Sequence, residues 1–164
     1  MPIKAKPNEY NPERGYIETS NSNYTPPDYE YLDAIGFTWT DPYRWARGSE
    51  VLASGRKFNM TDMIALQHDY LSIPARSLVP FFKDLPADDP QVEQARQMLL
   101  DWDFVLDRDS ITAGIYVAFE RQLLDNIESL KVPENAQQYL NVGMKTTIDF
   151  LLADRKSGSA GMPR

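Results

Sequence analysis

Apolar residues recur along this sequence mainly at intervals of three and four, and this spacing predicts a chain that is mostly helical after residue 44. The strongest helix begins after Asp109 or Ser110 as the capping residue, and its apolar stripe is wide enough to pack against other helices. The stripe consists of Ile111, Ile115, Phe119, Leu123, Ile127 and Leu130, widened by Tyr116 and Leu124. Further helices are predicted at 42–54, from Thr61 as the N-cap to Pro74, at 75–85, at 90–102 and, more weakly, at 133–153.

A single segment has the alternation of large and polar residues that predicts a strand. Residues 15–20 read GYIETS and run directly into Asn, Ser, Asp and Pro residues, which end strands because their side chains compete for backbone hydrogen bonds or fix φ. One strand cannot satisfy its own backbone groups, and the sequence offers no clear second strand. The predicted fold class is therefore α+β, a mainly helical fragment with one or two short strands, and the strand's partners are expected in a larger protein.

These patterns divide the 164 residues into three parts. Residues 1–14 form an irregular, Pro-rich arm, and residues 156–164 have the composition of a flexible linker. Between them, residues 15–155 comprise the strand with an aromatic loop at 15–44 and a helical region at 45–155. The length suits one domain.

The composition excludes several classes of function. A net charge of −7 lacks the basic footprint of a nucleic-acid-binding protein, and no apolar run approaches the roughly 20 residues of a membrane span. We therefore expect neither nucleic-acid binding nor membrane insertion. Without cysteine there are no disulfides and no thiol catalysis, and the single histidine, His68, is expected on an exposed helix face rather than in a Ser-His-Asp triad.

Several sequence blocks occur in a characteristic order. Gly-Tyr-Ile at 15–17 precedes Asn21, a Pro-rich aromatic loop and the pattern Trp-x-x-x-x-Arg that ends at Arg44. Downstream come MIALQHD at 63–69 with SIPAR and VP behind it, and then LLDWD at 99–103, with Asp, Ser and Ala at 109–113. In this order the blocks, which span about residues 14 to 120, resemble the β-chain of the penicillin acylase family of N-terminal-nucleophile amidohydrolases.

The resemblance implies the αββα N-terminal-nucleophile hydrolase fold, of which this chain would be an internal piece of the β-chain. The family cleaves linear amide bonds of N-acylated small molecules, such as β-lactam antibiotics or acyl-homoserine lactones, with a serine at the N-terminus of the β-chain. That serine is expected outside this chain, so the chain alone is expected to be inactive and to need the α-chain and the rest of the β-chain. No cofactor is expected for the chemistry, and the resemblance implies a periplasmic or secreted location.

Two residues are candidates for the catalytic site that the resemblance implies. Asn21 stands at the place of the family's oxyanion-hole asparagine, whose side-chain amide stabilises the negative oxygen of the transition state; an ordinary turn asparagine is the alternative. Arg44 matches the family arginine that helps to hold the asparagine and the substrate with its planar fork of donors. A surface ion pair is the alternative for Arg44, and Arg47 competes for the same role.

Structural calcium is the one metal that the resemblance suggests. Asp33 falls in the loop where some family members place a calcium-binding carboxylate, whose other ligands would come from elsewhere in the acylase; a solvated loop aspartate is the alternative. The acidic cluster at 101–109 fails the EF-hand template because Leu106 stands where Gly is needed and Thr112 where Glu is needed. The aromatic residues of 24–45 either line an acyl pocket or belong to the core.

A second hypothesis comes from another class of function. The broad apolar stripe of residues 111–130 would also suit a non-enzymatic helical binding or assembly module. The two hypotheses differ in what precedes Met1, because only the acylase requires an upstream segment that contains a serine exposed by processing.

Overall fold

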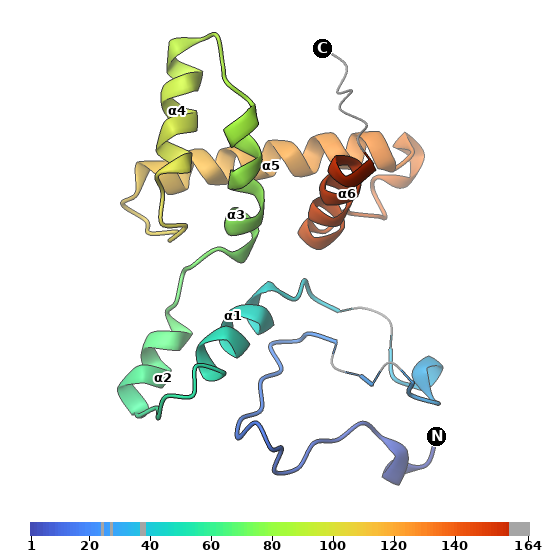
Figure 1. The fold of residues 1–164 in the computed structure, drawn as a ribbon. Helices are drawn as coiled ribbons and strands as arrows, with labels where there is room; N and C mark the ends of the chain where they lie inside the picture. The colour runs from blue at the N-terminus through green and yellow to red at the C-terminus, as the bar shows by residue number, and fades with distance from the viewer. Residues whose placement is uncertain (24, 27, 37–38, 158–164) are drawn as a thin grey trace. The chain divides into compact units, whose positions relative to one another are not determined.

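The computed structural model of the chain describes residues 1–157 apart from 24, 27, 37 and 38, and describes side chains as far as residue 153. Two compact units divide the chain, residues 1–69 and the residues from Tyr70 onward, and each is described by itself. α-Helices and short 3₁₀-helices make up nearly all the regular structure of the described residues (Figure 1). The mainly helical character is therefore confirmed. No helix in this part of the chain is long and apolar enough to cross a membrane.

The described residues of the first unit form two α-helices, α1 Tyr43–Leu52 and α2 Met60–Gln67. Before α1, its described residues are irregular except for two single-turn 3₁₀-helices, η1 Ile3–Ala5 and η2 Leu32–Ala34. The helix predicted at 42–54 is confirmed as α1. Gly55 follows it with a φ of +75°, a conformation that glycine adopts without the steric penalty of a Cβ.

The N-cap of α2 is Asn59, so the prediction of Thr61 as N-cap is wrong. Asn59 Oδ1 accepts a hydrogen bond from the Asp62 backbone nitrogen at 3.0 Å, and Asp62 Oδ2 accepts one from the Asn59 backbone nitrogen at 2.9 Å. This capping box satisfies two backbone donors at once, which explains why the N-cap lies two residues before the predicted one. Hydrogen bonding by the Asn59 backbone nitrogen also lowers the pKa of Asp62, with a smaller contribution from Arg56.

The strand predicted at residues 15–20 is not formed, and this prediction is wrong. Within the described residues the β-structure is limited to one isolated antiparallel bridge, between Leu71 and Val105. A strand is stable only when neighbouring strands satisfy its backbone groups, and the described chain supplies none beside residues 15–20. The segment ends instead in a turn, in which the Ser22 backbone nitrogen donates to the Thr19 carbonyl oxygen at 2.8 Å.

The second unit contains the longest helix, α5 Ile111–Lys131, which is the long horizontal ribbon in Figure 1. Before it come α3 Ile73–Leu78, the 3₁₀-helix η3 Val79–Asp84 and α4 Pro90–Leu100. After it come the 3₁₀-helix η4 Glu134–Ala136 and α6 Met144–Ser157. The predicted flexible tail at 156–164 therefore begins inside α6, and its part from residue 158 lies outside the described residues.

Capping residues set the starts of these helices. Ser72, Asp89 and Ser110 each accept a hydrogen bond from a backbone nitrogen in the first turn of α3, α4 and α5. Pro74 lies in the first turn of α3 and does not end a helix that began near residue 61. The prediction that a helix ends at Pro74 failed because proline fits the first turn of a helix, where no backbone hydrogen-bond donor is lost.

The core of the second unit gathers on the first half of α5. Its buried residues are Ala75, Val79, Leu99, Trp102, Ala113 and Tyr116. Tyr116 is fully buried, whereas Ile111 is 74% exposed and Leu130 is 70% exposed, so the ends of the predicted stripe do not contribute to this core. The buried face of α5 is thus shorter than its apolar stripe, because the two ends of the helix are left exposed.

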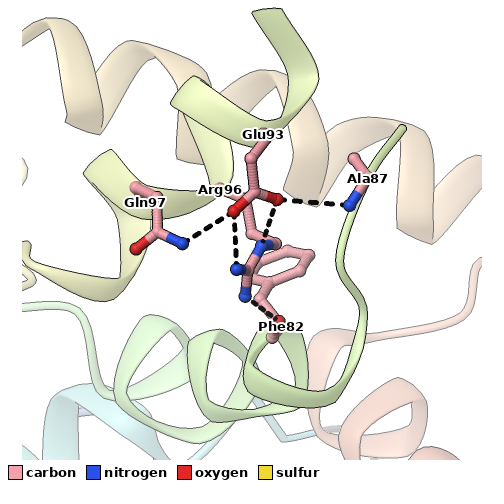
Figure 2. A network of polar contacts seen from close by, with 5 residues as sticks. All are labelled: Phe82, Ala87, Glu93, Arg96 and Gln97. Carbon is pink, nitrogen blue, oxygen red and sulfur yellow. Dashed lines mark hydrogen bonds and ion pairs between the residues drawn. The ribbon is translucent and has the colours of Figure 1, made fainter. Parts of the chain in front are cut away.

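A polar network ties η3 and the loop after it to α4 (Figure 2). Glu93 accepts hydrogen bonds from Arg96 Nε at 2.7 Å, from Gln97 Nε2 at 2.7 Å and from the Ala87 backbone nitrogen at 3.2 Å. Arg96 Nη1 donates in turn to the Phe82 carbonyl oxygen at 2.8 Å. These donors, with Arg96 the strongest, lower the pKa of Glu93 to about 2.

Candidate active site

Asn21 and Arg44 are brought into direct contact in the first unit. Arg44 Nη2 donates to Asn21 Oδ1 at 3.0 Å and to the Ser20 carbonyl oxygen at 3.2 Å, across 23 and 24 positions of sequence. Arg44 lies in the first turn of α1, so the helix fixes the point from which its side chain reaches the turn. The predicted proximity of the two residues is confirmed, while their catalytic roles stay predictions.

The backbone of the turn is held from a second direction. Ser20 and Asn21 have positive φ angles of 37° and 59°, a conformation that favours glycine and is tolerated by asparagine. Thr40 Oγ1 donates to the Asn21 carbonyl oxygen at 3.1 Å and to the Ser20 carbonyl oxygen at 3.3 Å. Arg44 and Thr40 therefore satisfy the two carbonyl groups that this left-handed turn exposes, and this helps to stabilise it.

The contact with Arg44 also fixes which way the Asn21 amide faces. A guanidinium group carries only donors, so the amide oxygen must point toward Arg44 and the amide nitrogen must point away from it. Asn21 is exposed, and among the described residues its Nδ2 donates to no protein atom. The amide therefore leaves two N–H donors exposed to solvent, and donors of this kind are what an oxyanion hole requires.

Arg47, the competing arginine, has a different set of partners. Its Nε and Nη2 donate to Asp69 Oδ2 at 2.9 and 2.7 Å, and its Nη1 lies 3.2 Å from Glu50 Oε1. Hydrogen bonding to Asp69 is the main cause that raises the pKa of Arg47. Arg47 thus links α1 to Asp69, two residues after the end of α2, whereas Arg44 contacts Asn21.

The calcium prediction for Asp33 gains no further carboxylate or histidine ligands among the residues that the structure describes. Asp33 is exposed within η2, and the described residues assemble no group of three or more His, Asp or Glu side chains that would hold a metal ion. Asp33 remains a predicted ligand whose partners would come from elsewhere. In the acidic cluster, Asp103 and Asp107 accept hydrogen bonds from the backbone nitrogens of Val105 and Asp109, as expected for turn residues.

Comparison with known protein families shows to which family the chain belongs. A family model described as penicillin amidase matches residues 1–160, nearly the whole chain. This chain belongs to the penicillin amidase family. No curated protein gives a significant match.

Two cavities flank the aromatic loop of this penicillin amidase chain. The larger, of about 780 Å³, is lined by residues that include Tyr16, Ile17, Glu18, Tyr29 and Trp45. The smaller, of about 320 Å³, is lined in part by Ile35 and Trp39. Several of the aromatic residues predicted to form a pocket or a core therefore line open space, whereas Tyr24 and Phe37 of the same loop lie outside the described residues.

Sequence patterns missed two residues of the amidase chain that lie behind the Asn21 turn: Glu18, which accepts a hydrogen bond from Ser20 Oγ, and Gly48, which contacts Glu18. Glu18 lies against α1 at Gly48, which is the buried residue of that helix. A glycine inside a helical pattern lowers helix propensity and often has a packing reason. Gly48 could therefore have indicated that another segment packs closely against this helix. The sequence did not indicate which side chain would fill the space above it.

Proposed function

We propose that this chain carries the oxyanion-hole asparagine of a penicillin-acylase-type hydrolase that cleaves linear amide bonds of N-acylated small molecules. The observation that carries the proposal is the hydrogen bond from Arg44 Nη2 to Asn21 Oδ1, which turns the amide nitrogen of Asn21 outward. The family match over residues 1–160 supports a hydrolase of this type. β-Lactam antibiotics and acyl-homoserine lactones are the proposed substrate classes.

The proposed chemistry is acyl transfer. When a nucleophile adds to the substrate's amide carbon, the carbonyl oxygen becomes negatively charged, and Asn21 Nδ2 would donate to that oxygen. One such donor stabilises a transition state by about 3–4 kcal/mol. Arg44 does not react; it holds the amide in the productive orientation and limits the conformational freedom of the donor.

The nucleophile in this proposal comes from the remainder of the acylase. A serine whose own α-amino group acts as the base attacks the amide carbon, releases the amine and forms an acyl-enzyme ester, which water then hydrolyses. The α-chain and the rest of the β-chain are therefore the proposed partners, together with the small-molecule amide. A periplasmic or secreted location and a structural calcium ion bound in part by Asp33 are further proposals that rest on the family resemblance alone.

The larger cavity of the first unit is the proposed site for the acyl group. Its volume of about 780 Å³ falls within the range of small-molecule sites, and its lining includes Tyr16, Tyr29 and Trp45 beside charged side chains. Two of its other lining residues, Glu18 and Thr19, come just before the turn that bears Asn21. The lining of this cavity is therefore close in sequence to the proposed oxyanion donor, Asn21.

The alternative of a non-enzymatic assembly module finds less support. That proposal would use the apolar stripe of α5 as a partner surface, but Ala113, Tyr116 and Ile127 on this helix are buried within the second unit. The exposed apolar residues at the two ends of α5, Ile111 and Leu130, are far apart along the helix and do not form the continuous stripe that the module needs.

The proposed function is tested by comparing two preparations. The purified 164-residue chain should hydrolyse neither phenylacetylated amides nor acyl-homoserine lactones above a blank, because the serine nucleophile is supplied elsewhere. The acylase assembled with its α-chain and remaining β-chain should release amine from at least one of these substrates. Turnover by the chain alone, or an assembled protein that hydrolyses no N-acylated amide, would contradict the proposal.

A further inference from the structure

Gly48 is the point at which the segment before Asn21 contacts helix α1. Gly48 is buried, and a Cβ added to it would lie 2.9 Å from Glu18 Oε2 and 3.0 Å from Glu18 Cδ. Cβ atoms in proteins do not approach other heavy atoms that closely, so the present position of the Glu18 carboxylate requires a residue without a side chain at 48.

The same segment contacts α1 a second time, one turn earlier. Arg44 and Gly48 are four positions apart and so lie on the same face of the helix. Arg44 binds the Ser20 carbonyl oxygen and the Asn21 side chain, while Gly48 accommodates Glu18. Ser20 Oγ donates to Glu18 Oε1, and this hydrogen bond joins the two contact points within the segment.

We propose that Glu18 and Gly48 are positioning residues, which set the place of the Asn21 amide by docking residues 18–21 on one face of α1. The inference rests on the proposed function for its catalytic consequence. A Cβ at 48 displaces the Glu18 carboxylate, and the displaced carboxylate no longer accepts from Ser20 Oγ, so the left-handed turn at Ser20 and Asn21 loses one of the hydrogen bonds that hold it. Asn21 Nδ2 is then misplaced with respect to the developing oxyanion.

Gly48→Ala in the assembled acylase is the direct test of the catalytic consequence. A displacement of about 1 Å costs up to ~100-fold in rate, and the flexible Glu18 side chain absorbs part of the change, so we expect kcat to fall by several-fold and by at most about 100-fold. KM should change little, because an oxyanion donor acts in the transition state rather than on the bound substrate. Gly114→Ala on α5 is the matched control, since a Cβ there meets nothing within 4 Å, and it should leave kcat unchanged.

A second readout does not depend on activity. In the full chain, the NMR resonances of the Asn21 side-chain amide should shift in Gly48→Ala and stay in place in Gly114→Ala. Glu18→Ala alone should also shift them, because Ser20 Oγ loses its acceptor. In the Glu18→Ala background, adding Gly48→Ala should cause no further shift, since the side chain that it displaces is gone.

The possible outcomes separate this inference from the proposed function. If Gly48→Ala leaves both kcat and the Asn21 resonances unchanged, or has an equal effect with and without Glu18, the positioning role is refuted. If the wild-type acylase hydrolyses no N-acylated amide, the proposed function fails, while the resonances still decide whether Gly48 and Glu18 position Asn21. Should Gly48→Ala fail to fold, unchanged Asn21 resonances in Glu18→Ala would refute the role, and shifted ones would support it.

Discussion

At the scale of single residues, Arg44 is the cation that contacts the Asn21 turn among the described residues of the first unit. It donates to both the Asn21 side chain and the Ser20 carbonyl oxygen, and so joins the orientation of the amide to the shape of its turn. Arg47, which lies about one helical turn further along α1, donates hydrogen bonds to Asp69 and pairs with Glu50 instead. The distinction between the two arginines comes from their partners, because both stand on the same short helix.

Arg44→Lys should lower kcat of the assembled acylase by about tenfold or more, because a lysine ammonium on its flexible stem does not reproduce the fixed position from which Arg44 Nη2 donates to two oxygens. Steady-state kinetics on an N-acylated amide measure the effect. Arg56→Lys is the control, since Arg56 is an exposed residue that pairs with Asp62 and does not contact the turn. Equal kcat values for Arg44→Lys and Arg56→Lys would contradict the role of Arg44.

At the scale of elements, local polar contacts decide where helices begin and how they are joined. Asn59 with Asp62 starts α2, and Glu93 with Arg96 fastens α4 to the end of η3 (Figure 2). The capping contacts join residues two or three positions apart and can be recognised in the sequence. For this reason Asp89 before Pro90 correctly predicted the start of α4. Thr61 failed as a cap because the nearby Asn59 forms a reciprocal pair with Asp62.

Glu93 should make the stability of the chain depend on pH in the acid range. Its pKa falls from the ordinary glutamate value of 4.5 to about 2 in the folded protein, so the unfolded state binds more protons between these values. Its contribution to the free energy of unfolding is therefore complete above the unfolded pKa and is lost as the pH falls from about 4.5 toward about 2. In urea titrations, Glu93→Gln should be less stable than wild type at pH 7, and the difference should shrink toward pH 2. A difference that stays constant with pH would refute this assignment.

Gly114→Ala should stabilise the chain by about 0.8–1.0 kcal/mol, because alanine is the better helix former and its Cβ would meet nothing within 4 Å. The reverse exchange at the exposed Ala118, on the same helix, should destabilise the chain by a similar amount. Denaturation midpoints in urea provide the comparison. A loss of stability in Gly114→Ala would mean that the surroundings of this residue are not open.

At the scale of the whole molecule, the sequence predicted the helices better than the candidate site. Helices such as α4 and α5 carry their own signals in capping residues and apolar spacing. The strand at residues 15–20 was predicted wrongly because a strand depends on partners that local sequence does not contain.

The site shows the same limit. The meeting of Asn21 with Arg44 was predicted through the family resemblance, since no spacing rule joins residues 23 positions apart. Glu18 over Gly48 was missed for the same physical reason: the neighbours of a helix glycine come from a remote segment.

The most direct test of the central claim is kcat of the assembled acylase with Asn21→Ala, measured beside Asn23→Ala as the control. Asn23 is an exposed turn residue that accepts a hydrogen bond from the Thr25 backbone nitrogen and does not contact Arg44. If Asn21 supplies the oxyanion donor, Asn21→Ala should lower kcat by about 100- to 1000-fold with little change in KM or folding, and Asn23→Ala should not. A kcat for Asn21→Ala within about threefold of wild type would contradict the account, because one lost donor is expected to cost far more.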